Sequence, residues 1–532
     1  MRNLTRRAAP ALVTLLLAGT ARAEAPTTTP PPAAPRTDAP APAPRPSQAE
    51  VQASLNAIGA ADTRRLLTDR AYAGELLGHL DRIAPYMSND PAAANAVRNM
   101  RLLAFATLER PTDGAPLIDQ IIEARPNEAG QYAAAWLAAL TFHDRGRAVA
   151  LIETASRAVP GVRWADLRNM LDRQTVSSLL FQLKTGRENA ARVRFAEALF
   201  RIGWPGGGDL ESGDFIRSIL LEDRLAAGDT AAARDYANGI TTLGNTVPLL
   251  LGKRYDVALP AGADRLALLR AAIERQDRAT REALAAAPGD LQRLVERAAY
   301  LRGLARDDEA LALLRPHLAD VPATAANGEH GMWVVNEAAL ALSTLGRDEE
   351  ALALMDRIAA LPLAGNPQLM GLRINHLGLL WGAGRYDEVL RRAAALDVDA
   401  QRFASDYGRA GIAAIRVCAL ASLGRTAEAA PLIERLRGWS ELNPVALSDA
   451  YLCLGDDAAA AALMVRRLEA ADPDPAIQTL QDYTLGPAAR GPTAALHQRF
   501  MALRDRPEVR AALDRVGRRM SLPLSRSYWG DF

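Results

Sequence analysis

Apolar residues recur at helical spacing from about Gln48 to about Arg519, and no stretch shows the alternation expected of a series of strands. Short polar breaks interrupt this pattern at intervals. Each break is expected to join two antiparallel helices. The pattern therefore predicts an all-α protein built from successive helix pairs.

Two segments of this helical pattern have nearly the same sequence. Residues 304–314 read LARDDEALALL and residues 345–355 read LGRDEEALALM, which identifies an internal repeat. A glycine marks the turn of most units, with successive gaps of 42, 77, 41, 38, 40 and 31 residues, so the longest gap corresponds to two units. The markers are Gly186, Gly228, Ala305 in the equivalent place, Gly346, Gly384, Gly424 and Gly455.

Each marker has a physical role. Glycine after a helix adopts the left-handed conformation at little cost. Acidic residues that follow it cap the next helix. Five residues after the glycine a small or β-branched residue allows close helix approach, and four residues later an apolar or small residue completes the buried face. These residues are Ala191, Ala233, Ala351, Val389, Ala429 and Ala460, then Phe195, Ala237, Met355, Ala393, Ile433 and Met464.

This order of glycine, alanine and apolar residue, with Pro160, Pro362 and Pro473 at or beside the closing position, resembles the tetratricopeptide repeat (TPR) over residues 88–469. The resemblance implies an α-α superhelix, a solenoid of antiparallel helix pairs whose first helices line an open concave groove. The spacing near 40 exceeds the usual 34 of that family, so Sel1-like and other helix-pair repeats stay open.

In the register of that family, five side chains are expected to face the groove. Tryptophan and arginine are frequent anchors in binding surfaces. A tryptophan on a helix is also commonly part of the core, so each position has a structural interpretation too. The candidate groove residues are Gln292, Arg302, Trp333, Asn336 and Trp381.

The N-terminus has the features of an export signal. Arg2, Arg6 and Arg7 precede an apolar run, and Ala21-Arg22-Ala23 suits cleavage before Glu24. The run is too short to span a bilayer, so the mature chain is expected to have no integral membrane segment and to be periplasmic or secreted. Residues 24–47 are rich in Pro and Ala, a composition that predicts a disordered linker.

The remaining chain is expected to divide into N-terminal repeats (48–240), C-terminal repeats (241–518) and a tail (519–532). The segment from Gly203 to Gly208 predicts a long loop. The segment from Gly244 to Gly262 predicts a distorted unit or an inserted hairpin, because two prolines bracket an apolar run. The tail is expected to cap the last helix pair with its aromatic side chains, which are Tyr528, Trp529 and Phe532.

Charge gives little support for nucleic-acid binding. The chain has 63 basic and 62 acidic residues, and only Lys184 and Lys253 are lysines. The arginines are scattered among acidic residues at helical spacing rather than gathered into a basic block. A nucleic-acid partner is therefore not expected.

No motif for catalysis, a metal or a cofactor stands out. The histidines are dispersed without metal-ligand spacing, and no nucleophile motif is present. Cys418 and Cys453 fall on neighbouring first helices about one turn out of step, so we expect two buried free thiols rather than a disulfide. The histidines are His79, His143, His317, His330, His376 and His497.

Three functional hypotheses follow. The first is an exported TPR-like scaffold or adaptor that binds a protein or peptide in the cell envelope, without catalysis or cofactor. The alternative is a peptidoglycan-processing or glycan-binding protein with a helical superhelix similar to that of lytic transglycosylases, although the residues after Glu469 are too few for their catalytic domain. The third is a receptor for a small ligand near Trp333 and Trp381.

Overall fold

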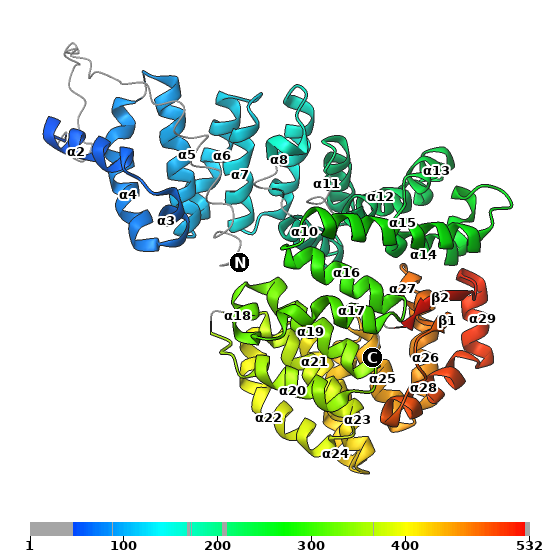
Figure 1. Cartoon of the computed structure of the whole chain (residues 1–532). Helices are drawn as coiled ribbons and strands as arrows, with labels where there is room; N and C mark the ends of the chain where they lie inside the picture. The colour runs from blue at the N-terminus through cyan, green and yellow to red at the C-terminus, as the bar shows by residue number, and fades with distance from the viewer. Residues whose placement is uncertain are drawn as a thin grey trace. The chain divides into compact units, whose positions relative to one another are not determined.

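The structure is a computed structural model, and it describes residues 46–87, 89–167, 171, 173–204, 210–364 and 366–526. The predicted signal peptide and nearly all of the Pro/Ala-rich linker lie outside these ranges. So do most of the loop after Gly203 and the three tail aromatics. Within these ranges the protein is all-α apart from two short strands, as the apolar pattern predicts (Figure 1).

The chain divides into two compact units between Ile240 and Thr241. The helices of the first unit follow one another in chain order (Figure 1). They are α2 (Gln48–Gly59), α3 (Thr63–Thr68), α4 (Arg70–Ile83), η1 (Ala84–Tyr86), α5 (Pro91–Thr107), α6 (Pro111–Ala124), α7 (Ala129–Thr141), α8 (Arg145–Ala158), α9 (Trp164–Leu167), α10 (Arg173–Thr185), α11 (Asn189–Arg201), α12 (Leu210–Ala226) and α13 (Thr230–Asn238).

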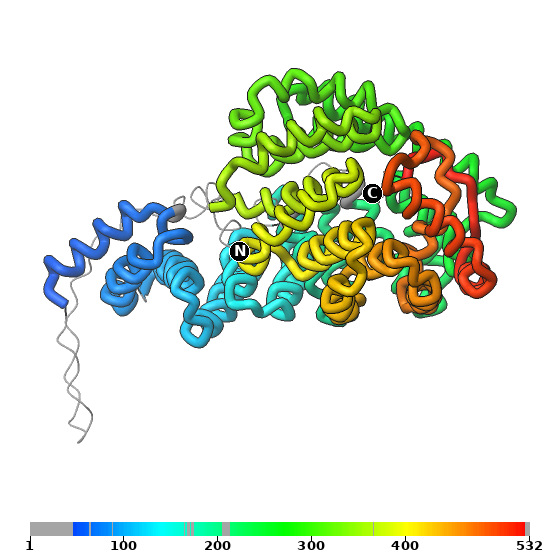
Figure 2. The backbone as a smooth tube through the Cα atoms, turned by 90° about the horizontal axis from the view of Figure 1, so that it is seen from below, coloured from blue at the N-terminus to red at the C-terminus, as the bar shows by residue number. Residues whose placement is uncertain are grey.

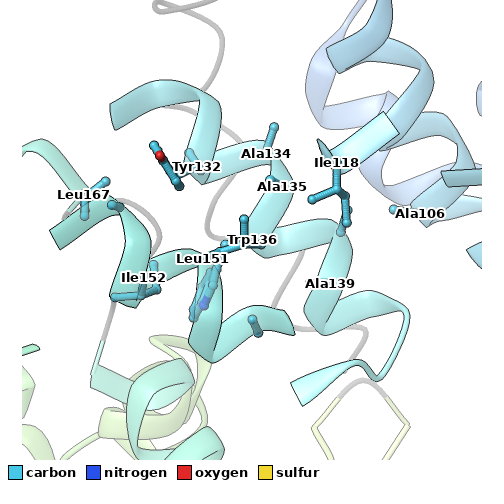
Figure 3. Packing of buried hydrophobic residues seen from close by; sticks show 14 of the residues in the cluster. Ala106, Ile118, Tyr132, Ala134, Ala135, Trp136, Ala139, Leu151, Ile152 and Leu167 are labelled. Carbon is cyan, nitrogen blue, oxygen red and sulfur yellow. The ribbon is translucent and has the colours of Figure 1, made fainter. Parts of the chain in front are cut away.

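Helix α7 is central to the core of the first unit. Its Trp136 and Tyr132 are fully buried, among apolar side chains of α6 and α8 such as Ile118 and Ile152 (Figure 3). The Tyr132 hydroxyl donates to the carbonyl oxygen of Pro126 at 2.9 Å, so burial of this ring leaves no unsatisfied hydroxyl.

The second unit continues the helix pairs and ends in a different arrangement. Its elements are α14 (Leu243–Leu251), η2 (Lys253–Ala258), α15 (Arg265–Ala286), α16 (Leu291–Gly303), α17 (Asp307–Leu314), η3 (Arg315–His317), α18 (Val321–Ala326), α19 (Glu329–Thr344), α20 (Asp348–Ala359), α21 (Leu369–Gly382), α22 (Tyr386–Phe403), α23 (Asp406–Ser422), α24 (Thr426–Gly438), α25 (Pro444–Leu454), α26 (Asp457–Leu468), α27 (Asp474–Thr479), β1 (Asp482–Leu485), α28 (Gly491–Arg504), α29 (Pro507–Val516) and β2 (Ser521–Ser525).

The predicted turn glycines lie at helix ends, between the two helices of a pair. Gly228, Gly346, Gly384, Gly424 and Gly455 all have a positive φ. Four equivalent turns carry another residue at positive φ, and the sequence had marked only one of them, Ala305. The first predicted turn lies one residue later than its marker, because Arg187 rather than Gly186 has the left-handed backbone conformation. The four are Glu109 (α5/α6), His143 (α7/α8), Arg187 (α10/α11) and Ala305 (α16/α17).

Replacement of Ala305 by glycine is expected to stabilise the second unit. Ala305 has φ 54°, where a Cβ costs about 1 kcal/mol relative to glycine. The greater entropy of glycine in the unfolded chain offsets part of this gain, so we expect about 0.5 kcal/mol. Chemical denaturation of Ala305→Gly against the wild type measures it. A loss of stability would contradict a left-handed turn at this position.

Five of the six small residues that were predicted to follow the turns are buried. Ala233, Ala351, Val389, Ala429 and Ala460 are all nearly inaccessible. The sixth, Ala191, is only half-buried, because its turn lies one residue later than predicted, at Arg187. A further repeated feature escaped the sequence analysis, because its charges read as a solvated face. The arginine after the turn residue forms a two-bond ion pair with the glutamate three positions later in three units, which fixes the first turn of the second helix. The pairs are Arg306–Glu309, Arg347–Glu350 and Arg425–Glu428.

The segment between Gly244 and Gly262 is a distorted helix pair and not a hairpin. Helix α14 contains Pro248 and is followed by the 3-10 helix η2, after which Gly262 turns the chain into α15. Helices α14 and α15 pack together, so this pair fills the longest gap in the repeat spacing.

The end of the second unit returns to its beginning (Figures 1 and 2). The Arg518 guanidinium donates to both Asp256 carboxylate oxygens at 2.6 and 2.8 Å, and the Tyr255 hydroxyl donates to Asp474 at 2.6 Å. Strands β1 and β2 pair in parallel beside these contacts. The prediction of almost uninterrupted helix up to Arg519 is therefore wrong at β1, where pairing between residues about 40 apart overrides a local pattern, whereas α28 and α29 are helices as expected.

The prediction of two free thiols is also wrong. Cys418 on α23 and Cys453 on α25 form a disulfide, with Cα atoms 5.1 Å apart. The prediction assumed parallel first helices with their turns level and 8–10 Å between axes. The observed distance requires a displacement of about one turn along the axes, but no closer approach. Each Cα lies about 2.3 Å from its axis, so facing Cα atoms of helices 8–10 Å apart are only about 3.4–5.4 Å from each other. Both helices carry buried alanines, which suit close packing, and they are Ala410, Ala413, Ala414, Ala446 and Ala450.

Candidate binding surface

The five predicted groove residues lie on three first helices that pack in order, α16, α19 and α21. Each of them lies 13, 10 or 3 residues before the turn residue of its own helix pair. Helical periodicity places these positions on one side of each helix. We call this side the first-helix face of the second unit.

Two of the five side chains belong to a buried polar network. The Arg302 guanidinium donates to Glu337 at 2.7 Å, and the Asn336 amide lies 3.4 Å from the other Glu337 oxygen. The Asn375 amide on α21 donates to Asn336 at 2.8 Å. The network therefore joins three consecutive first helices, and it fixes their spacing because the members are hydrogen-bonded to one another.

Asp307 lies at the edge of this network, 3.6 Å from Arg302. Burial raises the pKa of Asp307 from 3.8 to about 6, although the positive charge of Arg302 acts in the opposite direction. The carboxyl group thus binds its proton more tightly in the folded protein than in the unfolded chain. Its contribution to stability is present below about pH 4 and is lost as the pH rises toward 6.

The Asp307→Asn variant is therefore expected to match the wild type near pH 4 and to exceed its stability at pH 7.5. The expected gain is on the order of 2 kcal/mol, since an amide carries no charge to bury. Denaturation curves between pH 4 and 7.5 measure the difference. Asp308→Asn, at the exposed neighbouring position, is the control. A constant difference between wild type and Asp307→Asn across this range would contradict the assignment.

Trp381 is buried, with 7% of its surface exposed. It packs in a cluster with Leu380, Val389 and Cys418, and Leu496 of α28 lies against the same cluster. The position is on the first-helix face, but α28 covers it. The sequence did not reveal this cover, because α28 lies outside the repeats.

Gln292 and Trp333 are the two candidates that stay half-exposed. Both are 13 residues before their turn, and the amide of Gln292 donates to Glu296 on its own helix at 2.9 Å. The next two units carry glycine at this position. A Cβ at Gly371 would meet no atom within 4 Å, so the surface is open at this position of α21. The same position in the following units is held by Gly411 and the exposed Leu442.

Helix α28 crosses the turns at the other end of the first helices. The Arg490 guanidinium donates to the carbonyl oxygen of Ser343 at 2.6 Å and lies 3.6 Å from Asp348. The Arg499 guanidinium lies 3.7 Å from Asp457. Helix α28 therefore covers the first-helix face near these turns, whereas Trp333, near the opposite end of its helix, stays partly exposed.

A shallow depression lies between α15, α16 and α17, with a volume of about 540 Å³. Its apolar lining includes Leu284, Leu301 and Leu313, and its charged rim is already paired, since Arg297 binds Asp277 at 2.8 Å. A smaller depression between α22, α23 and α24 is lined by residues at the same positions relative to its own turn. Neither depression brings together free polar groups suited to chemistry.

His376 is buried and lies 3.6 Å from Asp356. Burial and the nearby positive charge of Arg392 lower its pKa to about 4, so the imidazole is neutral at physiological pH. No group of three or more His, Cys, Asp or Glu residues with metal-binding geometry occurs among the residues that the structure describes.

Together these features define an all-α protein of stacked helix pairs with a half-covered first-helix face. No protein-family model matches the chain, and no curated protein matches it. Over the described ranges, no helix has both the length and the apolar content needed to cross a membrane.

Proposed function

We propose that this chain is an exported, TPR-like scaffold that binds a segment of another protein in the cell envelope. The proposed contact surface is the part of the first-helix face of the second unit that contains Trp333 and that α28 leaves uncovered. The proposal includes no nucleic-acid partner, no cofactor and no catalytic step. Its α-α superhelix and its periplasmic location are parts of the proposal, based on the repeat register and on the features of the N-terminal segment.

One observation carries the proposal. Trp333 is a large aromatic side chain that stays partly exposed, at the register position that Gly371 holds on the next first helix, and these helices are held together by a buried polar network. A rigid surface with a partly exposed tryptophan suits recognition of a protein segment, because little side-chain entropy is lost on binding.

Affinity capture from envelope extract tests the proposal with matched variants. Trp333→Ala is expected to lose the captured partner at least tenfold, while Trp333→Phe keeps part of the binding. Val398→Ala, at a position on α22 that is 79% exposed, is the control and should capture as the wild type does. Equal recovery by wild type and Trp333→Ala, with both proteins folded, would contradict the proposed surface.

Two further measurements address the location and the absence of catalysis. The mature protein from the periplasmic fraction is expected to begin at Glu24, which N-terminal sequencing determines. A peptidoglycan zymogram is expected to show no clearing. Clearing by the purified chain would contradict the scaffold proposal and favour the transglycosylase-like alternative.

A further inference from the structure

Helix α28 uses the same contact twice, at two different units. The Arg490 side chain lies over Gly346, where a Cβ would come within 2.6 Å of its guanidinium. The Arg499 side chain lies over Gly455 in the same way, at 2.5 Å. Each guanidinium also approaches the aspartate two residues after that glycine, which is Asp348 or Asp457.

These two turns differ from their neighbours in a way that matches this contact. The turns at Gly384 and Gly424 have Tyr386 and Thr426 in place of the aspartate, and a Cβ on either glycine would meet no atom within 4 Å. Asp307, two residues after Ala305, is next to Arg302 of its own unit, and Asp264, two residues after Gly262, caps α15. Two turns of the second unit therefore combine glycine and an aspartate that α28 can reach.

The first half of α28 is held by these exposed contacts and by the partly buried Leu496, which lies against the Trp381 cluster. No side chain from Gly491 to Arg499 is buried, whereas Phe500, Leu503 and Arg504 are. The residues between β1 and α28, from Gly486 to Arg490, are all exposed. Exposed ion pairs contribute little to stability, and this half of α28 has only partly buried side chains, so it is attached more weakly than the second half.

We propose that the Gly346–Asp348 and Gly455–Asp457 turns form a paired site for a helical segment of a partner protein. That segment carries two arginines nine residues apart with an apolar residue between them. In the structure the first half of α28 occupies this site, so the partner segment must displace it. This inference depends on the proposed function, because it assigns the same partner a second contact, at the opposite end of the first helices from Trp333.

The geometry explains the required spacing. Nine residues of helix span about 14 Å, so two arginines at this distance reach two turns at once. Leu496, between them, packs beside Trp381 and the Cys418 side chain. A partner helix with one arginine would engage only one turn and would compete poorly with α28.

A fluorescein-labelled peptide of residues 486–499 tests the site in the full mature chain. The Arg490→Ala/Arg499→Ala variant, whose own helix competes less, is expected to bind the peptide at least tenfold more tightly than the wild type. Adding Asp348→Ala and Asp457→Ala to this variant should reverse the gain. A peptide with both arginines replaced by alanine should not bind. Equal affinity of wild type and double-arginine variant would overturn the proposal, as would binding independent of the aspartates.

Hydrogen exchange in the wild type tests the same point without a variant. Amides of residues 494–499 are expected to exchange at least tenfold faster than those of residues 500–504. Equal exchange rates along the whole of α28 would contradict the proposal that a partner displaces its first half. If the Trp333→Ala variant still loses its partner in that case, only this inference fails, and the proposed function stands.

Discussion

Removal of the Cys418–Cys453 disulfide is expected to lower the free energy of unfolding of the second unit by about 3–4 kcal/mol. The bond closes a loop with a sequence separation of 35 residues, and this estimate follows from the entropy that the crosslink removes from the unfolded chain. Denaturation of the wild type with and without reductant measures the effect. The Cys418→Ala/Cys453→Ala variant should resemble the reduced wild type and should not respond to reductant.

The covalent state itself is measured by mass spectrometry after alkylation. The unreduced protein is expected to take up no alkyl group, and the reduced, unfolded protein is expected to take up two. Two alkylated thiols without reductant would contradict the bond between α23 and α25.

Gly331→Ala is expected to destabilise the second unit by about 3 kcal/mol. Gly331 is near the start of α19, and a methyl group there would overlap with the carbonyl oxygen of Thr324 on α18. That oxygen belongs to the backbone, so relief requires the two helices to separate. Thermal or chemical denaturation of the variant measures the loss.

Gly371→Ala is the matched control. Gly371 has the same place near the start of α21, but a methyl group there would meet no atom within 4 Å. The higher helix propensity of alanine should stabilise this variant by about 0.5–1 kcal/mol. Opposite signs for the two substitutions are therefore expected. A neutral Gly331→Ala variant would contradict the packing of α18 on α19.

Local features of the fold could be predicted from the sequence. The turn at Gly346 and the small Ala351 that follows it depend on conformational and packing rules within a few residues. Turns at Glu109 and His143 were missed, because their left-handed conformation is imposed by the packing of both helices and not by the residue itself. The strands β1 and β2 were missed for a similar reason, since each depends on a partner far along the chain.

The candidate surface could be predicted only in part. Helical register was enough to place Trp333 and Trp381 on the same side of successive first helices. Their exposure was not predictable, because α28 covers Trp381 and the repeats contain no signal for this cover. Arg302 resembled a surface anchor in the sequence, but its partner Glu337 on the next first helix makes it part of the buried network.

Site-specific photo-cross-linking tests the central claim most directly. A photoreactive phenylalanine analogue placed at position 333 or at the exposed position 398 is expressed in the full chain and irradiated in intact cells. The account predicts a discrete protein adduct from position 333 and none from position 398. Adducts of the same protein from both positions, or none from position 333, would contradict a partner that binds the first-helix face.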